Sequence, residues 1–160
     1  MATLGSMNVR AAVGQYLVAA AVFLALDLLW LVLIAEGLYD RYLGDLLAEE
    51  PNVAAAAAFY AIFVAGLVHF VIRPALAKDS WRKALTDGAA FGLVTYATWD
   101  LTNLAVLSGF PAEIVLVDMA WGAVLAATVS TATYHLWRRL GRASHGPRAA
   151  PEARTQPTDP

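Results

Sequence analysis

The sequence predicts an all-α fold, a four-helix transmembrane bundle, and three observations support this prediction. Of the 160 residues, 59% are hydrophobic and only 15% are charged, and the mean hydropathy of +0.57 lies above the usual range of soluble proteins. Apolar stretches recur at lengths close to the roughly 20 residues that a helix needs to cross a bilayer core. About four such crossings with short connections use most of the chain, so no separate soluble domain is expected.

Each expected span is bounded by residues that end helices. The four spans cover about residues 16–35, 53–72, 85–107 and 112–137. Pro51 and Asn52 precede the second span and Pro74 follows it, while Gly109 and Pro111 lie in a tight turn between the third and the fourth. The spans therefore form a single transmembrane domain.

This transmembrane domain is expected over residues 13–138, with a short segment on either side. Residues 1–12 precede it, and residues 141–160 form a tail that is rich in Pro, Ala, Arg and Thr and has no apolar periodicity. A tail of this composition buries too little apolar surface to offset its chain entropy, so we expect it to be disordered.

The basic residues predict the orientation of the chain. They gather before the first span, after the second and after the fourth: Arg10, Arg73, Lys78, Arg82, Lys83, Arg138, Arg139, Arg142, Arg148 and Arg154. The loop after the first span holds Arg41 among five acidic residues, and the turn at Pro111 has no basic residue. Because loops rich in Lys and Arg stay in the cytoplasm, we expect a multi-pass protein of the cell inner membrane with cytoplasmic N- and C-termini.

Three aspartates lie inside the apolar stretches, and no Lys or Arg accompanies them there. Asp27, Asp100 and Asp118 belong to three different spans. An ionisable residue at the centre of a membrane helix costs roughly 2.5 to 3.5 kcal/mol on insertion, so three of them indicate a function or a structural need. With a rise of about 1.5 Å per residue, all three fall in one layer, roughly 12 Å below the outer surface. The sequence therefore predicts a shared polar site.

Aromatic and amide side chains share helix faces with these acids, because residues three or four apart lie on one side of a helix. Asp27 has Trp30, Asp118 has Trp121, and Asp100 has Tyr96 and Asn103, with Trp99 adjacent in the sequence. Indole and phenol groups can donate to carboxyl oxygens, and Gly122 allows another helix or a ligand to approach closely. We therefore predict a ligand-binding pocket lined by Asp27, Trp30, Tyr96, Trp99, Asp100, Asn103, Asp118 and Trp121.

The motifs around these acids resemble those of domain-of-unknown-function family 2177 (DUF2177), small bacterial membrane proteins. The resemblance covers about residues 14–138 and rests on Asp27-Leu-Leu-Trp30, Tyr96-Ala-Thr-Trp-Asp100-Leu-Thr-Asn103 and Asp118-Met-Ala-Trp121-Gly122. It implies a four-helix inner-membrane protein, and it implies no particular activity.

The three aspartates and the aromatic and amide side chains that share their helix faces form what we call the polar layer. Three interpretations of this layer remain open. In the first, it is a pocket that binds or processes the polar end of a lipid or another amphipathic small molecule. In the second, the carboxylates form a proton or cation site in a small transporter or channel. In the third, the cluster only fixes helix packing, with hydrogen bonds of about 0.6 kcal/mol each. Whether the protein is an enzyme, and with which cofactor, is not determined by the sequence.

The expected partners are membrane lipids, an amphipathic ligand and a second copy of the chain. The small-residue run Ala54–Ala58 with Gly66 is typical of a close-packing helix face, either within the bundle or between protomers of a homo-oligomer. No metal site is assigned. Nucleic-acid binding is not expected, because the basic residues follow the topology rule and do not form a patch.

Overall fold

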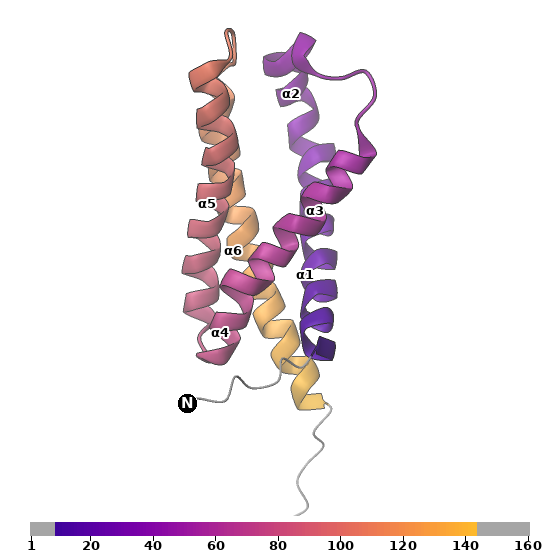
Figure 1. The fold of residues 1–160 in the computed structure, drawn as a ribbon, viewed down its shortest axis with the longest axis vertical. Helices are drawn as coiled ribbons and strands as arrows, with labels where there is room; N and C mark the ends of the chain where they lie inside the picture. The colour runs from indigo at the N-terminus through magenta and orange to yellow at the C-terminus, as the bar shows by residue number, and fades with distance from the viewer. Residues whose placement is uncertain (1–8, 144–160) are drawn as a thin grey trace, which may run out of the picture.

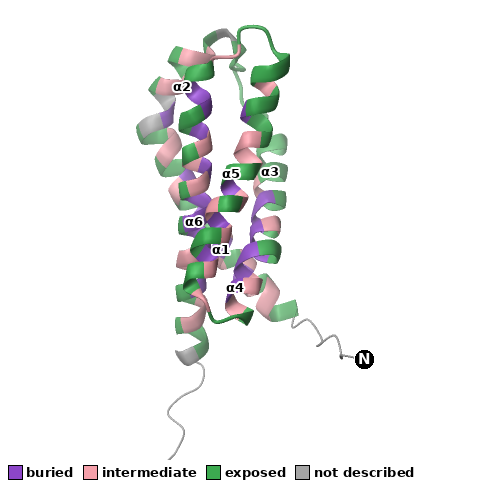
Figure 2. Ribbon diagram, turned by 90° about the vertical axis from the view of Figure 1, so that its left-hand side faces the viewer, coloured by how far each residue is buried: buried purple, intermediate pink, exposed green. Residues whose placement is uncertain are grey.

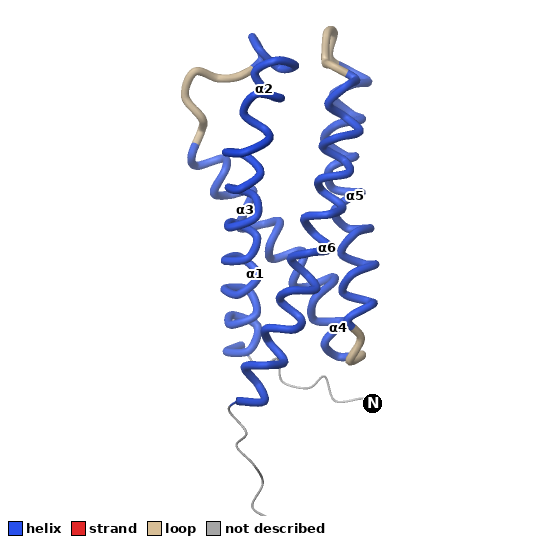
Figure 3. Tube along the Cα trace, turned by 180° about the vertical axis from the view of Figure 1, so that it is seen from behind, coloured by secondary structure: helices blue, strands red, loops and turns tan. Residues whose placement is uncertain are grey.

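The computed structural model describes residues 9–143. Between these residues the chain forms helices joined by short turns and no strand (Figures 1 and 3). The predicted all-α class is confirmed. Of the predicted N-terminal segment and tail, residues 9–12 and 141–143 belong to helices, and the rest lie outside the described residues.

The helices follow one another in four runs, and two of these runs contain a π-helical turn. The first run consists of α1 (Val9–Trp30), the π-turn η1 (Leu31–Ala35), α2 (Glu36–Leu43) and the 3-10 turn η2 (Gly44–Leu46). The second run consists of α3 (Val53–Leu67), the π-turn η3 (Val68–Ile72) and α4 (Arg73–Ala77). The third and fourth runs are the single helices α5 (Trp81–Val106) and α6 (Ala112–Ala143). The start of α1, the end of α6 and the turn between α4 and α5 all lie at one end of the molecule (Figure 1).

Local side-chain contacts explain where several helices begin and turn. The Asn52 carboxamide oxygen accepts a hydrogen bond from the Ala55 N–H at 3.0 Å, and the Ser80 hydroxyl oxygen accepts one from the Lys83 N–H at 3.2 Å, so both residues cap the helices that follow. In the turn between α5 and α6, Gly109 has a φ of +82°, a conformation that glycine adopts without steric cost. The turn predicted at this position is confirmed.

Three helices in the described part of the chain are long and apolar enough to cross a membrane: Val9–Leu33, Val53–Ala77 and Ala112–Gly141. The predicted third span lies on α5, which is not among them although it has 26 residues. Polar residues interrupt its apolar sequence, including Asp100, Asn103 and several threonines. Three of the four predicted crossings are thus matched by apolar helices.

Helices α5 and α6 pack closely because glycines lie between them. A Cβ atom added to Gly88 would lie 2.8 Å from the carbonyl oxygen of Ala126, and one added to Gly92 would overlap the carbonyl of Gly122. A Cβ atom at Gly122 would in turn overlap the ring of Tyr96. The prediction that Gly122 allows a close approach is confirmed, and the element that approaches is α5.

The buried residues lie mainly on the helix sides that face one another, and exposed residues lie on the outside (Figure 2). Many of the exposed residues are large and apolar. Phe23, Leu67 and Leu125, from α1, α3 and α6, belong to one core cluster. Exposed apolar side chains along α1, α3 and α6 form a surface of the kind that contacts lipid. Ala54–Ala58 are also exposed, so this run does not pack within the described chain, and its contact with a second protomer remains a prediction.

Replacing Gly92 by alanine is expected to destabilise the protein by about 1–3 kcal/mol, because the new methyl group would meet the backbone of α6. Gly37→Ala is the control, since a Cβ atom there meets nothing within 4 Å and alanine favours the helix by up to about 1 kcal/mol. Thermal unfolding midpoints in detergent should fall for the first variant and stay level or rise for the second. Equal midpoints would show that the α5–α6 contact tolerates a larger separation.

Candidate functional site

Two of the three predicted acids are paired with tyrosines from other helices. The Tyr60 hydroxyl donates to Asp27 at 2.8 Å and links α3 to α1, and the Tyr39 hydroxyl donates to Asp118 at 2.8 Å and links α2 to α6. Both aspartates are buried, with 7% and 8% of their surface exposed. These phenol groups compensate for part of the hydration that each carboxyl loses.

Neither tyrosine was among the predicted site residues. Tyr39 follows the first predicted span, which was expected to end near residue 35, whereas the helical run continues through α2 to Leu43. The π-turn at Leu31–Ala35 lies between the Asp27 motif and α2, and such turns change the direction in which the next residues point. Tyr39 lies beyond the end of the first apolar helix at Leu33. Burial, and then the charge of Asp118, raise the pKa of the Tyr39 phenol. The phenol therefore keeps its hydrogen and remains a donor at neutral pH.

The two Asp-x-x-Trp motifs meet through their tryptophans. The rings of Trp30 on α1 and Trp121 on α6 stack at 4.3 Å between centroids with an interplanar angle of 9°. The Trp121 indole approaches Asp27, and the Trp30 indole approaches Tyr39. Neither indole N–H achieves hydrogen-bond geometry, and both are buried without a partner among the described residues.

Tyr96 lies in the interface between α5 and α6, where its ring rests against Gly122. It borders the same hollow as Asp118 of α6 and Tyr39 of α2. That Tyr96 forms a ligand site with acids from other helices remains a prediction.

Asp100 differs from the other two acids because it has no hydrogen bond. Its surface is 0% exposed, and both carboxyl oxygens are buried without a partner among the described residues. The Asn103 amide nitrogen, one turn further along α5, is also unpartnered. Asp118 on the neighbouring helix α6 lies within electrostatic reach of Asp100.

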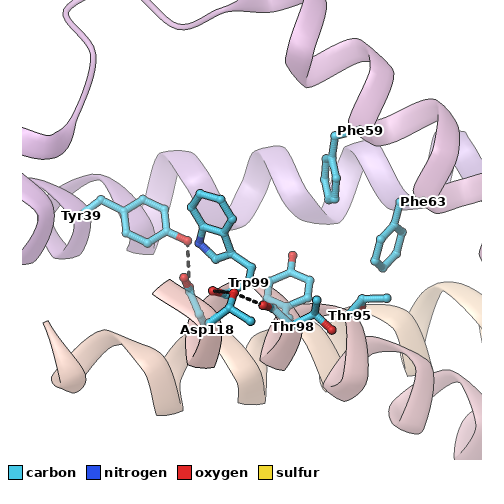
Figure 4. A pocket seen from close by; sticks show the side chains of 9 residues that line it. Tyr39, Phe59, Phe63, Thr95, Thr98, Trp99 and Asp118 are labelled. Atoms are coloured by element: carbon cyan, nitrogen blue, oxygen red, sulfur yellow. Dashed lines mark hydrogen bonds between the residues drawn. The ribbon is translucent and has the colours of Figure 1, made fainter. Parts of the chain in front are cut away.

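A cavity of about 600 Å³ lies beside the polar layer (Figure 4). Helices α2, α3, α5 and α6 all contribute to its walls. The lining residues are Tyr39, Phe59, Phe63, Thr95, Tyr96, Thr98, Trp99, Thr102 and Asp118. At one end Tyr39 points toward Asp118, and Phe59 and Phe63 form the opposite aromatic wall (Figure 4).

The structure divides the predicted site residues into two groups. Tyr96, Trp99 and Asp118 line the cavity, and Trp99 is 65% exposed at its rim. The other predicted residues do not line it: Asp27, Trp30, Asp100, Asn103 and Trp121. Trp30 and Trp121 instead border a separate, apolar hollow between α1 and α6.

Sequence reasoning missed part of the cavity wall. The residues not predicted as site residues are Tyr39, Phe59, Phe63, Thr95, Thr98 and Thr102. Thr95, Thr98 and Thr102 are spaced three and four residues apart beside Trp99, so they form a stripe along α5. This stripe was the one sequence signal that could have located the wall.

The described residues contain no group of three or more His, Asp or Glu side chains that could hold a metal ion. The three aspartates are therefore buried in one region without forming a metal-binding cluster. This arrangement offers no support for direct coordination of a divalent cation by the carboxylates.

Comparison with known families identifies the class of the chain. The family described as "Predicted membrane protein (DUF2177)" matches residues 12–135, which include all three acidic motifs. The chain belongs to this family, as the resemblance of its motifs predicted, and it is a multi-pass membrane protein. Searches among curated proteins and solved structures give no match.

Loss of the Tyr60 hydroxyl is expected to lower stability by about 0.6 kcal/mol, and at most about 1.7 kcal/mol, because Tyr60→Phe leaves the buried Asp27 without its donor. Tyr16→Phe is the matched control, since its hydroxyl makes only an exposed 3.4 Å contact with the Ala61 carbonyl. Chemical unfolding in mixed micelles measures both variants. A smaller effect at Tyr60 than at Tyr16 would contradict a stabilising role for the Tyr60–Asp27 bond.

Asp100→Ala is expected to leave stability unchanged or raise it, because no hydrogen bond is lost and an unpartnered buried carboxyl, with a desolvation penalty of about 1–3 kcal/mol, is removed. Asp27→Ala should be destabilising, because it breaks the bond from Tyr60. The same unfolding assay compares the two. If Asp100→Ala were the more destabilising substitution, Asp100 would be a packing residue.

Proposed function

We propose that this protein binds an amphipathic small molecule, such as a lipid, in the cavity between α2, α3, α5 and α6. The observation that carries the proposal is the cavity itself, which combines aromatic walls with one buried carboxyl group. Its volume of about 600 Å³ is within the range of about 300–1,000 Å³ that is usual for small-molecule sites.

The composition of the walls suits a ligand with one polar and one apolar end. Asp118 and Tyr39 form the polar end, whereas Phe59 and Phe63 provide apolar area. Phe59 and Trp99 are 46% and 65% exposed on the outside of α3 and α5. A ligand with a hydrocarbon tail could therefore enter from the bilayer with its tail still in lipid.

A purely structural role explains only part of the polar layer. Tyrosine hydrogen bonds account for Asp27 and Asp118. They do not account for Asp100, whose carboxyl group is fully buried without a bond, or for the unpartnered Asn103 amide. Polar groups left in this state are more readily explained by a function than by packing.

The proposal includes α5 as a fourth crossing, with both termini in the cytoplasm. Helix α5 packs along α6, and its 26 residues span about 39 Å at 1.5 Å per residue, enough to cross a hydrocarbon core of about 30 Å. Basic residues gather at the end of the molecule that holds the α4–α5 turn, including Lys78 and Arg82. The positive-inside rule favours the cytoplasm for that end.

Single cysteines test this topology directly, because the chain has no native cysteine. In bacterial spheroplasts, a membrane-impermeant maleimide is expected to label Ser108→Cys, in the α5–α6 turn, but Lys78→Cys only after the membrane is permeabilised. Both positions are exposed. Labelling of both variants, or of Lys78→Cys alone, in intact spheroplasts would refute the proposed arrangement.

The ligand proposal predicts that Asp118→Asn retains the fold but loses co-purifying lipid or other amphiphile at least about tenfold, equivalent to about 1.4 kcal/mol of binding. Asn preserves size and the acceptor for Tyr39 but removes the charge. Asp87→Asn is the control, since Asp87 pairs with Lys83 outside the cavity. Mass spectrometry of extracts from equal amounts of folded protein gives the comparison. Equal amphiphile content in both variants and the parent would contradict the proposal.

A further inference from the structure

We infer that the cavity selects a ligand whose polar end donates hydrogen bonds and carries no negative charge, as an amine or a hydroxyl group does. This inference rests on the proposed function and names the chemical class of the ligand. It excludes phosphate head groups from the cavity.

The charge of the cavity is the first argument. Asp118 is the one acidic residue in its walls, and no Lys, Arg or His lines it among the described residues. Arg41 is the basic residue closest to Tyr39 in the sequence, but it is exposed and lies 5.6 Å from the centre of the Tyr42 ring. A phosphate group in the cavity would meet a carboxylate without a compensating cation, which is unfavourable away from water.

The hydrogen-bonding capacity of the walls is the second argument. Thr95 and Thr98 donate their hydroxyl hydrogens to the carbonyls of Phe91 and Val94, at 2.9 and 2.7 Å, and Thr102 donates to the carbonyl of Thr98. These hydroxyl groups can therefore offer a ligand only acceptor lone pairs.

The carboxyl group at the end of the cavity also accepts. One oxygen of Asp118, Oδ1, receives the Tyr39 hydrogen bond, and Oδ2 has no hydrogen bond with the described residues. The wall does contain donors in the Tyr96 hydroxyl and the exposed Trp99 indole. The Asp118 carboxyl group and the hydroxyl groups of the three threonines nevertheless act as acceptors. A ligand head group that donates hydrogen bonds therefore has more partners in the cavity than one that accepts them.

The surroundings of Asp118 favour an amine over a hydroxyl. Asp100 on α5 is fully buried and lies within electrostatic reach of Asp118 on α6, so two ionised carboxylates would repel, and neither has a basic hydrogen-bond partner among the described residues. A protonated amine at Asp118 would reduce this repulsion and form a charge-assisted hydrogen bond. The rings of Tyr39, Phe59 and Trp99 border the same space, and aromatic faces attract ammonium groups.

Three brominated amphiphiles with the same long tail test the inference: a primary amine, a primary alcohol and a monoester of phosphate. Each is added to the full-length protein in phosphatidylcholine nanodiscs, and quenching of tryptophan fluorescence by bromine placed near the head group reports binding. Trp99→Phe should remove most of the quenching, which assigns the signal to the cavity rim. The amine and the alcohol should each bind at least about tenfold more tightly than the phosphate.

Asp118→Asn should weaken the amine at least about tenfold while changing the alcohol by less than about threefold, and Asp87→Asn should change neither. Because Asp87 lies outside the cavity, it controls for the loss of one negative charge.

The possible results separate this inference from the proposed function. Binding of the phosphate as tight as that of the amine and the alcohol, or an amine affinity unaffected by Asp118→Asn, would overturn the donor inference while leaving a ligand site in place. Absence of saturable, Trp99-dependent quenching by all three probes would instead reject the cavity as an amphiphile site. Tighter binding of the alcohol than of the amine would overturn the preference for an amine that is argued from Asp118.

Discussion

Carboxyl groups that are buried among apolar helices without a basic partner impose the strongest constraint on this protein. For two of the three acids, donors from another helix replace part of the lost hydration shell, and these donors are phenols. Tyr60 compensates for Asp27 and joins α3 to α1, while Tyr39 compensates for Asp118 and joins α2 to α6. These two hydrogen bonds thus link helical runs that also pack through the apolar core cluster and the α5–α6 glycines.

The cavity forms where two kinds of packing meet. Glycines bring α5 and α6 into backbone contact, and these two helices carry Asp100 and Asp118. Between α3 and α5 the contacts are instead made by large rings, and Phe63 packs edge-on against Phe91 at 5.4 Å between centroids. Large side chains lie between these two helices, and Phe59 and Trp99 beside the cavity are 46% and 65% exposed.

Helical spacing was sufficient to predict much of the polar layer. The two Asp-x-x-Trp motifs place their tryptophans on the same faces as their acids, and the structure stacks Trp30 on Trp121. Tyr96 was expected beside Asp100 and lines the cavity together with Tyr39 and Asp118. Spacing did not indicate that Trp99 points outward or that Tyr39 belongs to the site. The acidic, polar sequence after residue 35 is typical of a loop, whereas a π-turn extends the helix into α2.

The sequence by itself determined the membrane class, the family and the burial of three aspartates, because hydropathy and helical periodicity are local properties of the chain. Only the tertiary structure decided which acids are paired and which one is not. The partners in the two phenol–carboxyl bonds are separated by 33 and 79 residues, so no local pattern could specify them. Asp100 is left without a bond because no side-chain donor among the described residues reaches its carboxyl group.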